Sequence, residues 1–184
     1  MDAGIADLPQ GTTLDATAFG PCCPQVPAVY APNQAEACQN LNVYAPADMA
    51  DAIGEGEEEG KACPVMAWIH GGAYEVGAAF WFPGDHLVRD AGACVVVVTL
   101  AYRLGVLGNL NLGEGAGLRN FGYADQAAAL AWVHGNVGAF GGDAGRVTLF
   151  GESAGGGSVV YHLTTPSSWP LFARGIAESA GPWI

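Results

Sequence analysis

Three predicted strands constrain the fold of this chain more than any other feature. Residues 64–69 and 93–100 form almost continuous apolar runs, as in a strand that is buried on both faces, and residues 146–150 are expected to form a third buried strand. Residues 120–134 and 158–163 carry apolar faces that favour helices, between and after these strands. Strands that alternate with helices predict a mostly parallel α/β sheet with flanking helices.

Two shorter segments extend this prediction. Residues 41–45 alternate between apolar and polar side chains and end before Pro46, which is typical of a short strand. Residues 176–177 are expected to open another strand. The chain contains no internal repeat and no linker between two domains, so its 184 residues are expected to form one domain.

Composition excludes several classes of protein. The chain has 18 acidic and 6 basic residues, a net charge of −12, which argues against binding to nucleic acids or anionic membranes. Its hydrophobic content of 51% excludes global disorder. No segment reaches the roughly 18 apolar residues of a membrane helix. The acidic residues 1–7 do not resemble a signal peptide.

The cysteines do not indicate a metal site. There are five, so at least one is free in a monomer, and none forms a C-x-x-C pair of the kind that binds zinc or exchanges disulfides. Cys94 is expected to be a buried, small apolar residue at the start of a strand. No metal and no organic cofactor is predicted.

The motif with the clearest chemical meaning is Gly-Glu-Ser-Ala-Gly at residues 151–155. It matches G-x-S-x-G and lies directly after a predicted strand and before a predicted helix, which is the setting of a nucleophile elbow. Glycine at both ends allows strand and helix to approach closely. We therefore expect Ser153 in a strained turn with positive φ, where the helix amino terminus favours negative charge.

A second motif, His-Gly-Gly-Ala-Tyr at residues 70–74, follows a predicted buried strand. A glycine-rich loop can present free backbone N–H groups, which acyl transfer requires where a carbonyl oxygen becomes an oxyanion. We expect the N–H groups of Gly72, Ala73 and Ala154 to converge near the Ser153 hydroxyl.

The four histidines carry no spacing that indicates catalysis. His70 is expected to brace the glycine-rich loop. His86 is expected in a loop, and His134 and His162 in helices, all with surface or packing roles. A dinucleotide-binding unit is also not indicated, because no G-x-G-x-x-G opens a helix after the first strand.

Together these motifs resemble the type-B carboxylesterases, the carboxylesterase/cholinesterase family. Residues 68–74 are similar to the family's oxyanion segment, and residues 139–155 are similar to its nucleophile region at almost every position. Further similarity lies at residues 15–25, 36–44, 102–105 and 120–126. The resemblance implies an α/β-hydrolase fold, with residues 1–184 as a partial domain truncated at both ends.

The same resemblance implies roles for individual residues. Ser153 resembles the nucleophile, and the acidic Glu152 beside it helps to set the electrostatics of the site. Gly72, Ala73 and Ala154 resemble the oxyanion donors. Ala73 stands where a third glycine is common, but a backbone N–H donates equally well from alanine.

Two further features follow from the resemblance. Cys38 resembles the second cysteine of a family disulfide, and its partner is either Cys22 or Cys23. The family's triad acid and histidine follow the serine in chain order and would lie beyond residue 184. Neither Asp143 nor Glu178 stands at a position that matches the acid.

The implied function is hydrolysis of a small-molecule carboxylic ester through an acyl-enzyme, without a cofactor. Since no histidine matches the catalytic base, we expect residues 1–184 alone to hydrolyse esters poorly. Two alternatives stay open: a non-catalytic adhesion or interaction protein on the same fold, and an inactive truncated product.

The sequence restricts the substrate and the location only slightly. Tyr30 is the only aromatic residue between Cys23 and Cys38, which argues against the cation-stacking tryptophan of choline-selective relatives. The resemblance favours secretion or the lumen of the endoplasmic reticulum, whereas the visible amino terminus does not. Nothing in the sequence indicates an oligomeric state.

Overall fold

A computed structural model describes most of the chain. The described residues are 15–26, 31, 33–47, 49, 62–111, 113 and 120–181. They contain five strands, which are β1 (Leu41–Tyr44), β2 (Cys63–Ile69), β3 (Val96–Leu100), β4 (Gly142–Glu152) and β5 (Arg174–Glu178). Every strand expected from the sequence is therefore present, and β4 begins earlier than the strand predicted at residues 146–150.

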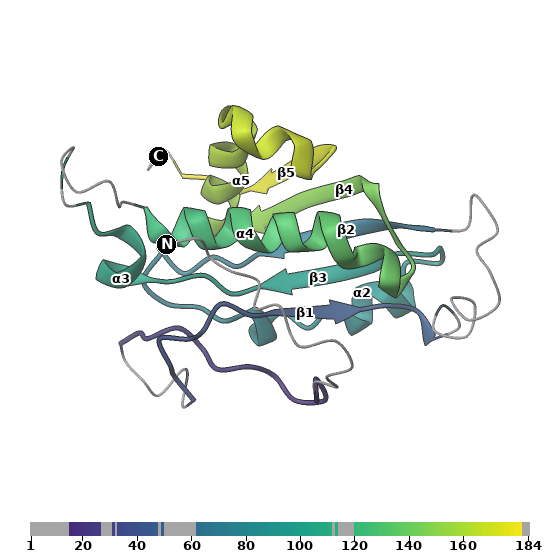
Figure 1. Ribbon diagram of the computed structural model, residues 1–184, viewed down its shortest axis with the longest axis horizontal. Coiled ribbons are helices and arrows are strands. Elements are labelled where there is room, and N and C mark those ends of the chain that lie inside the picture. Colours follow the sequence, from purple (N-terminus) through teal and green to yellow (C-terminus); the bar gives the residue numbers. More distant parts are fainter. Residues whose placement is uncertain are drawn as a thin grey trace.

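The five strands form a single sheet in the order β1-β3-β2-β4-β5 (Figure 1). The four strands β3, β2, β4 and β5 run parallel to one another, and β1 runs antiparallel to β3. This confirms the predicted mostly parallel α/β sheet. Because β2 and β4 are adjacent, with Ile69 opposite Gly151, the segments that follow these two strands emerge side by side.

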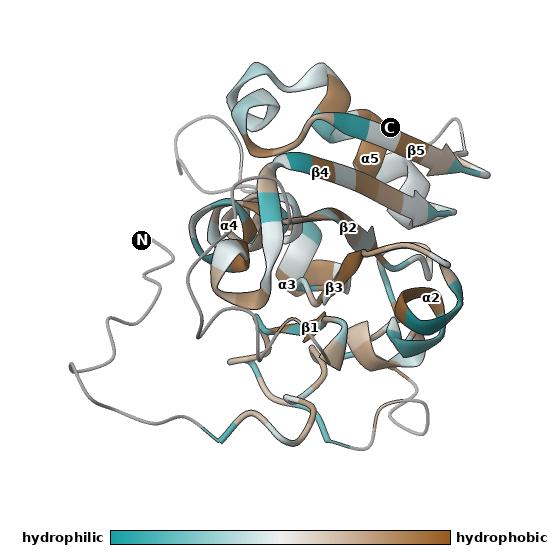
Figure 2. Ribbon diagram, turned by 90° about the vertical axis from the view of Figure 1, so that its right-hand side faces the viewer, coloured by the Kyte–Doolittle hydropathy of each residue, from teal (hydrophilic) through white to brown (hydrophobic). Residues whose placement is uncertain are grey.

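Helices cover both faces of the sheet, as Figures 1 and 2 show. Helix α4 (Phe121–Asn136) lies on one face, and its Leu130 and Val133 pack with Val96 and Val98 of β3 in the main core. The short helix α2 (Asp85–Asp90) lies on the other face. The side chains of a strand alternate between the two faces, so continuous apolar runs are needed to bury both.

Helix α5 (Ala154–Thr164) lies on the same side as α4 and is joined to it by a buried polar network. His162 Nε2–H of α5 donates to Gln126 Oε1 of α4 at 3.1 Å, and Gln126 Nε2–H donates to Ser158 Oγ at 3.0 Å. The remaining ring nitrogen, His162 Nδ1, accepts from Ser168 Oγ–H at 2.9 Å. Every polar atom of this imidazole therefore has a partner when the ring is neutral.

Some helices were not predicted. They are α2, α3 (Gly105–Asn109) and the 3-10 turns η2 (Ala79–Trp81), η3 (Val137–Phe140) and η4 (Pro166–Leu171). The expectation that His86 lies in a loop is wrong, because it lies in α2 with an exposed side chain. Helices of three to six residues show less than two turns of periodicity, so their apolar pattern is too short to recognise.

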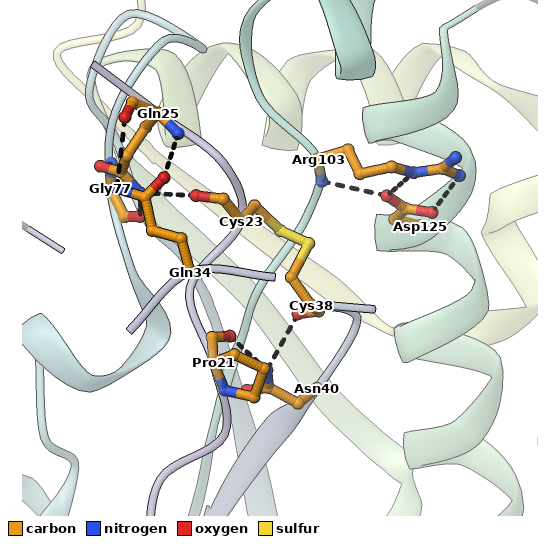
Figure 3. The surroundings of a disulfide bond; sticks show 9 residues. All are labelled: Pro21, Cys23, Gln25, Gln34, Cys38, Asn40, Gly77, Arg103 and Asp125. Atoms are coloured by element: carbon orange, nitrogen blue, oxygen red, sulfur yellow. Dashed lines mark hydrogen bonds and ion pairs between the residues drawn. A yellow bond between two sulfur atoms is a disulfide. The ribbon is translucent and has the colours of Figure 1, made fainter. Parts of the chain in front are cut away.

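The structure contains two disulfides, Cys23–Cys38 and Cys63–Cys94, with Cα–Cα distances of 4.9 and 5.2 Å. Figure 3 shows the first, which settles the partner of Cys38 and leaves the buried Cys22 as a free thiol. The prediction for Cys94 is wrong, since it is bonded to Cys63 and is exposed ahead of β3. Its apolar sequence neighbours gave no sign of that partner, 31 residues earlier.

Candidate active site

The turn between β4 and α5 holds Ser153 in a strained backbone conformation with positive φ. Its φ is 56° and its ψ is −120°, which confirms the predicted positive φ at this junction. An L residue with a side chain adopts such a conformation at a cost of about 1–3 kcal/mol, so the surrounding structure must enforce it. The N–H of Ser153 is fixed by donation to the carbonyl oxygen of Glu178 at the end of β5, at 2.9 Å.

Close backbone packing enforces this turn. A Cβ added to Gly155 would collide with the carbonyl oxygen of Ile69, at the end of β2. A Cβ added to Gly151 would lie 2.6 Å from both Ile69 O and the carbonyl carbon of Gly155. Only glycine allows strand β2, strand β4 and the first turn of α5 to meet this closely, which explains both glycines of the motif.

The loop that follows β2 packs directly against the serine turn. A Cβ added to Gly71 would lie 2.7 Å from Glu152 O and 3.2 Å from Ser153 Cβ. Gly72, Ala73 and Tyr74 all have positive φ, at 110°, 56° and 59°. The loop therefore packs against the serine turn in a strained conformation, beside the serine as the sequence predicts.

Ser153 faces a cavity of about 360 Å³. The cavity is lined by Ala73, Tyr74, Ser153, Ala154, Gly157, Ser179 and Gly181. Two of the three expected oxyanion donors, Ala73 and Ala154, thus share one cavity with the serine. Gly72 does not line it and lies one residue further back in the loop.

The three expected donors have no hydrogen-bond acceptor among the described residues. Within the described part of the chain, no group accepts a hydrogen bond from the N–H of Gly72, Ala73 or Ala154. Ala154 is the first residue of α5, where a helix leaves its N–H groups without partners and carries partial positive charge. A carbonyl oxygen that becomes negatively charged beside Ser153 would be stabilised by such groups.

His70 braces the loop from beneath. Its ring is 1% exposed and stacks on Tyr102 with a centroid distance of 4.4 Å. Its Nδ1–H donates to Gly71 O at 2.8 Å, and Tyr102 Oη–H donates to His70 O at 2.7 Å. Burial lowers the pKa of His70 to about 4, so the ring is neutral at neutral pH. His70 therefore has the structural role that the sequence predicts.

The other histidines do not enter the cavity. His162 is fully buried in the network between α4 and α5, and burial lowers its pKa to about 4. His86 and His134 are exposed on α2 and α4. All four histidines lie among the described residues, and none of them lines the Ser153 cavity.

Acidic residues near the serine lie at the ends of strands. Glu152 is exposed as the last residue of β4, and Glu178 pairs with it as the last residue of β5. Asp143 lies at the opposite end of β4 and pairs with Arg146 at 2.6 Å. In the described part of the chain, no cluster of histidine, cysteine and acidic residues could hold a metal ion, and no helix could span a membrane.

Sequence reasoning missed part of the cavity wall. Gly157 follows Ser153 by four residues, and helical periodicity places it on the same face of α5. Ser179 and Gly181 follow the end of β5, where parallel strands deliver their loops to one edge of the sheet. Tyr74 is the next residue of the glycine-rich loop. The strand order, which the sequence did not specify, was the missing information for Ser179 and Gly181.

The described site can be compared with known proteins. A model of the "Carboxylesterase family" matches residues 6–184. The chain is 49% identical to an acylcarnitine hydrolase of Mus musculus over 78% of its own length and 24% of that protein. It is 44% identical to a para-nitrobenzyl esterase of Bacillus subtilis (strain 168), over 90% of its length and 34% of that protein.

Solved structures of esterases are also similar to this chain. The structure of a PNB esterase, 45% identical in sequence, superimposes with a TM-score of 0.78 over 91% of this chain and 34% of that one. A carboxylesterase of Geobacillus stearothermophilus, 41% identical, superimposes with a TM-score of 0.73 over 87% and 32%. The chain thus spans between a quarter and a third of the length of these relatives.

Proposed function

The chain belongs to the carboxylesterase family and has the α/β-hydrolase fold, and from this we infer that it carries the nucleophile of a serine-dependent carboxylic ester hydrolase. One observation carries the inference. Ser153 is held with a positive φ at the strand–helix junction and faces a cavity that Ala73 and Ala154 also line. A binding protein on the same fold would have no use for free N–H groups beside a strained serine.

In the proposed reaction, Ser153 Oγ attacks the carbonyl carbon of an ester while its proton passes to a base. The carbonyl oxygen becomes an oxyanion, which accepts hydrogen bonds from the N–H groups of Gly72, Ala73 and Ala154. The bond to the alcohol then breaks, and the alcohol leaves with a proton. Water hydrolyses the resulting acyl-enzyme and restores the serine.

The base is assigned to a residue outside this chain's 184 residues. A serine hydroxyl is a weak nucleophile unless a base lies within hydrogen-bond reach. His70 and His162 are buried in hydrogen bonds of their own, and no histidine lines the cavity. Residues 1–184 alone are therefore expected to turn over esters poorly, and to react fully when a further segment or chain supplies the histidine and the acid.

A fluorophosphonate probe and a short-chain nitrophenyl ester test the assignment of Ser153. In the protein completed by the histidine and the acid, we expect the probe to label Ser153 and the label to disappear in Ser153→Ala. Ser179→Ala is the matched control, because Ser179 lines the same cavity and also has a positive φ, of 49°. Labelling that survives in Ser153→Ala but not in Ser179→Ala would overturn the assignment. Rapid labelling of residues 1–184 alone would overturn only the location of the base.

A further inference from the structure

We infer that Gln25 is a positioning residue for the oxyanion loop, which is defined here as residues 70–77. This inference rests on the proposed function, since it concerns the loop that presents Gly72 and Ala73. Gln25 lies far from the serine in sequence, in the loop closed by the Cys23–Cys38 disulfide, and its side chain reaches Gly77 (Figure 3).

The contact between Gln25 and Gly77 is a buried pair of hydrogen bonds. Gln25 Nε2–H donates to Gly77 O at 2.8 Å, and Gly77 N–H donates to Gln25 Oε1 at 2.9 Å. Gln25 is 7% exposed, so water does not replace either bond at low cost. Gln25 Nε2–H also donates to Cys23 O at 3.1 Å, which connects the amide to the disulfide. The amide therefore holds both polar groups of Gly77 at a fixed distance from Cys23.

Gly77 in turn holds His70. A Cβ on Gly77 would collide with Nδ1 and Cε1 of the imidazole, so the glycine backbone lies directly against the ring. Tyr102 stacks on the same ring at 4.4 Å. The imidazole is thereby fixed, and its Nδ1–H is directed at Gly71 O.

This bond sets the direction of the first proposed donor. A trans peptide unit is planar, so its N–H points away from its C=O. The carbonyl of Gly71 is bound by His70, and the N–H of the same peptide unit belongs to Gly72. Fixing the carbonyl therefore fixes the direction of the Gly72 N–H.

The second proposed donor is set in the same way from the other side of the loop. The carbonyl of Gly72 accepts from the N–H groups of Glu75 and Val76, at 2.9 and 3.0 Å. The N–H of that peptide unit belongs to Ala73, which lines the Ser153 cavity. Val76 directly precedes Gly77, so the Gln25 bonds anchor the end of this turn as well.

The loop closed by the Cys23–Cys38 disulfide thus influences the direction of both donor N–H groups through Gly77. Without Gln25, the two buried polar groups of Gly77 lose their partners, and the loop must shift to find others. Catalytic geometry tolerates such shifts poorly, because a displacement of 1 Å can reduce the rate by about 100-fold. The structure therefore assigns to Gln25 an effect on the transition state, without contact with the substrate.

The test compares Gln25→Leu with Gln34→Leu. Gln34 lies in the same disulfide loop and makes two hydrogen bonds to the backbone of Gln25, at 2.9 and 3.2 Å, but none to Gly77. Both variants therefore loosen the disulfide loop, and only the first removes the contact with Gly77. Gln25→Glu keeps the acceptor for Gly77 N–H and loses the donor, so it should lie between the two.

Two readouts separate positioning from general stability. Hydrogen exchange across residues 70–77 of this chain should rise in Gln25→Leu by at least about tenfold over Gln34→Leu at equal global stability. In the catalytically complete protein, kcat and the rate of Ser153 phosphonylation should fall between about 10-fold and 100-fold, with KM nearly unchanged.

Equal loop exchange and equal kcat in Gln25→Leu and Gln34→Leu would overturn the inference. A rise in KM with constant kcat would also overturn it, because that pattern reports binding of the substrate ground state. Failure of the proposed function is seen separately, as phosphonylation that does not depend on Ser153. The exchange readout needs no activity, so it decides the role of Gln25 in either case.

Discussion

The serine turn (residues 151–155) and the oxyanion loop (residues 70–77) face the same cavity but are held in place by different means. Backbone-to-backbone contact fixes the serine turn. Gly155 lies against Ile69, and Gly151 lies against both Ile69 and Gly155. Side chains from distant parts of the sequence fix the oxyanion loop, above all Gln25 and Tyr102. The serine turn therefore depends on glycines that have no side chain, and the oxyanion loop depends on side chains from distant parts of the sequence.

The largest effect is expected from Gly155→Ala, which tests the serine turn. The added methyl group would meet the carbonyl oxygen of Ile69, and because the clashing atoms belong to the backbone, no side-chain movement relieves the contact. We expect a loss on the order of 4 kcal/mol in the free energy of unfolding, measured by urea denaturation. Unchanged stability would contradict the close packing that we describe.

Gly135→Ala is the matched control for this substitution. Gly135 is the next-to-last residue of α4, and an added Cβ would meet nothing within 4 Å. Alanine favours a helix over glycine, and because the effect is smaller in the last turn than in the interior, stability should rise by up to about 0.5 kcal/mol. Opposite signs for the same chemical change would show that contact with Ile69, and not helix propensity, decides the effect.

Acid is expected to destabilise the fold, because one buried histidine lies under the oxyanion loop and another lies in the helix that follows the serine turn. His70 lies under the oxyanion loop and His162 lies in α5, and burial lowers the pKa of each to about 4. Below a pH of about 6.5 the unfolded chain binds protons at these rings and the folded chain does not. The free energy of unfolding should therefore fall by about 3 kcal/mol per histidine between pH 6.5 and pH 4.

Urea denaturation as a function of pH measures this loss, and His162→Gln separates the two sites. Removing the ring from the α5 network removes its share of the pH dependence and leaves that of His70. Carboxylates contribute equally to both proteins, so the difference between the two profiles isolates His162. Identical profiles for the wild type and His162→Gln would show that this imidazole is not kept neutral by folding.

Gly77→Ala tests the oxyanion loop with a smaller expected effect. The added methyl group would meet the imidazole of His70 and, at 2.8 Å, the carbonyl oxygen of Gly71, so the ring and its bond to Gly71 must shift together. The residue also has a φ of 138°, which alanine rarely adopts. We expect a loss of about 2 kcal/mol and faster hydrogen exchange at residues 70–77, with the serine turn unchanged. Exchange that rises equally in both segments would indicate that they form one cooperative unit.

The different supports of the serine turn and the oxyanion loop also explain which of their features could be predicted from the sequence. The serine turn was recognised because its determinants are contiguous: a buried strand, two glycines around Ser153, and a helix. The position of the oxyanion loop beside the serine was also predicted, from the motif and from chain order.

The contacts that hold the oxyanion loop were not predictable from local pattern. Gln25 and Gly77 are 52 residues apart, and neither has neighbours that indicate a partner. The prediction for Cys94 was wrong for the same reason, because its pairing with Cys63 depends on β2 and β3 being neighbours in the sheet. Strand order is decided by packing across the whole sheet, which one sequence read locally does not contain.

Ala73→Gly is expected to have the smallest effect and separates the backbone of the oxyanion loop from its side chains. Ala73 has a φ of 56°, a left-handed conformation that costs a residue with a side chain about 1 kcal/mol. Glycine removes this strain in the folded state but gives the unfolded chain about 0.5–1 kcal/mol more conformational entropy. The two terms oppose each other, so the free energy of unfolding should change by less than about 0.5 kcal/mol.

In Ala73→Gly, the N–H of residue 73 keeps its direction, because the bonds of Glu75 and Val76 to Gly72 O set it, and phosphonylation of Ser153 should proceed at the same rate. Gly72→Ala is the opposite case, since its Cβ would collide with Val76 O, and it should slow phosphonylation strongly. If Ala73→Gly slowed the reaction tenfold, the methyl group of Ala73, and not the peptide hydrogen bonds, would be what aims the donor.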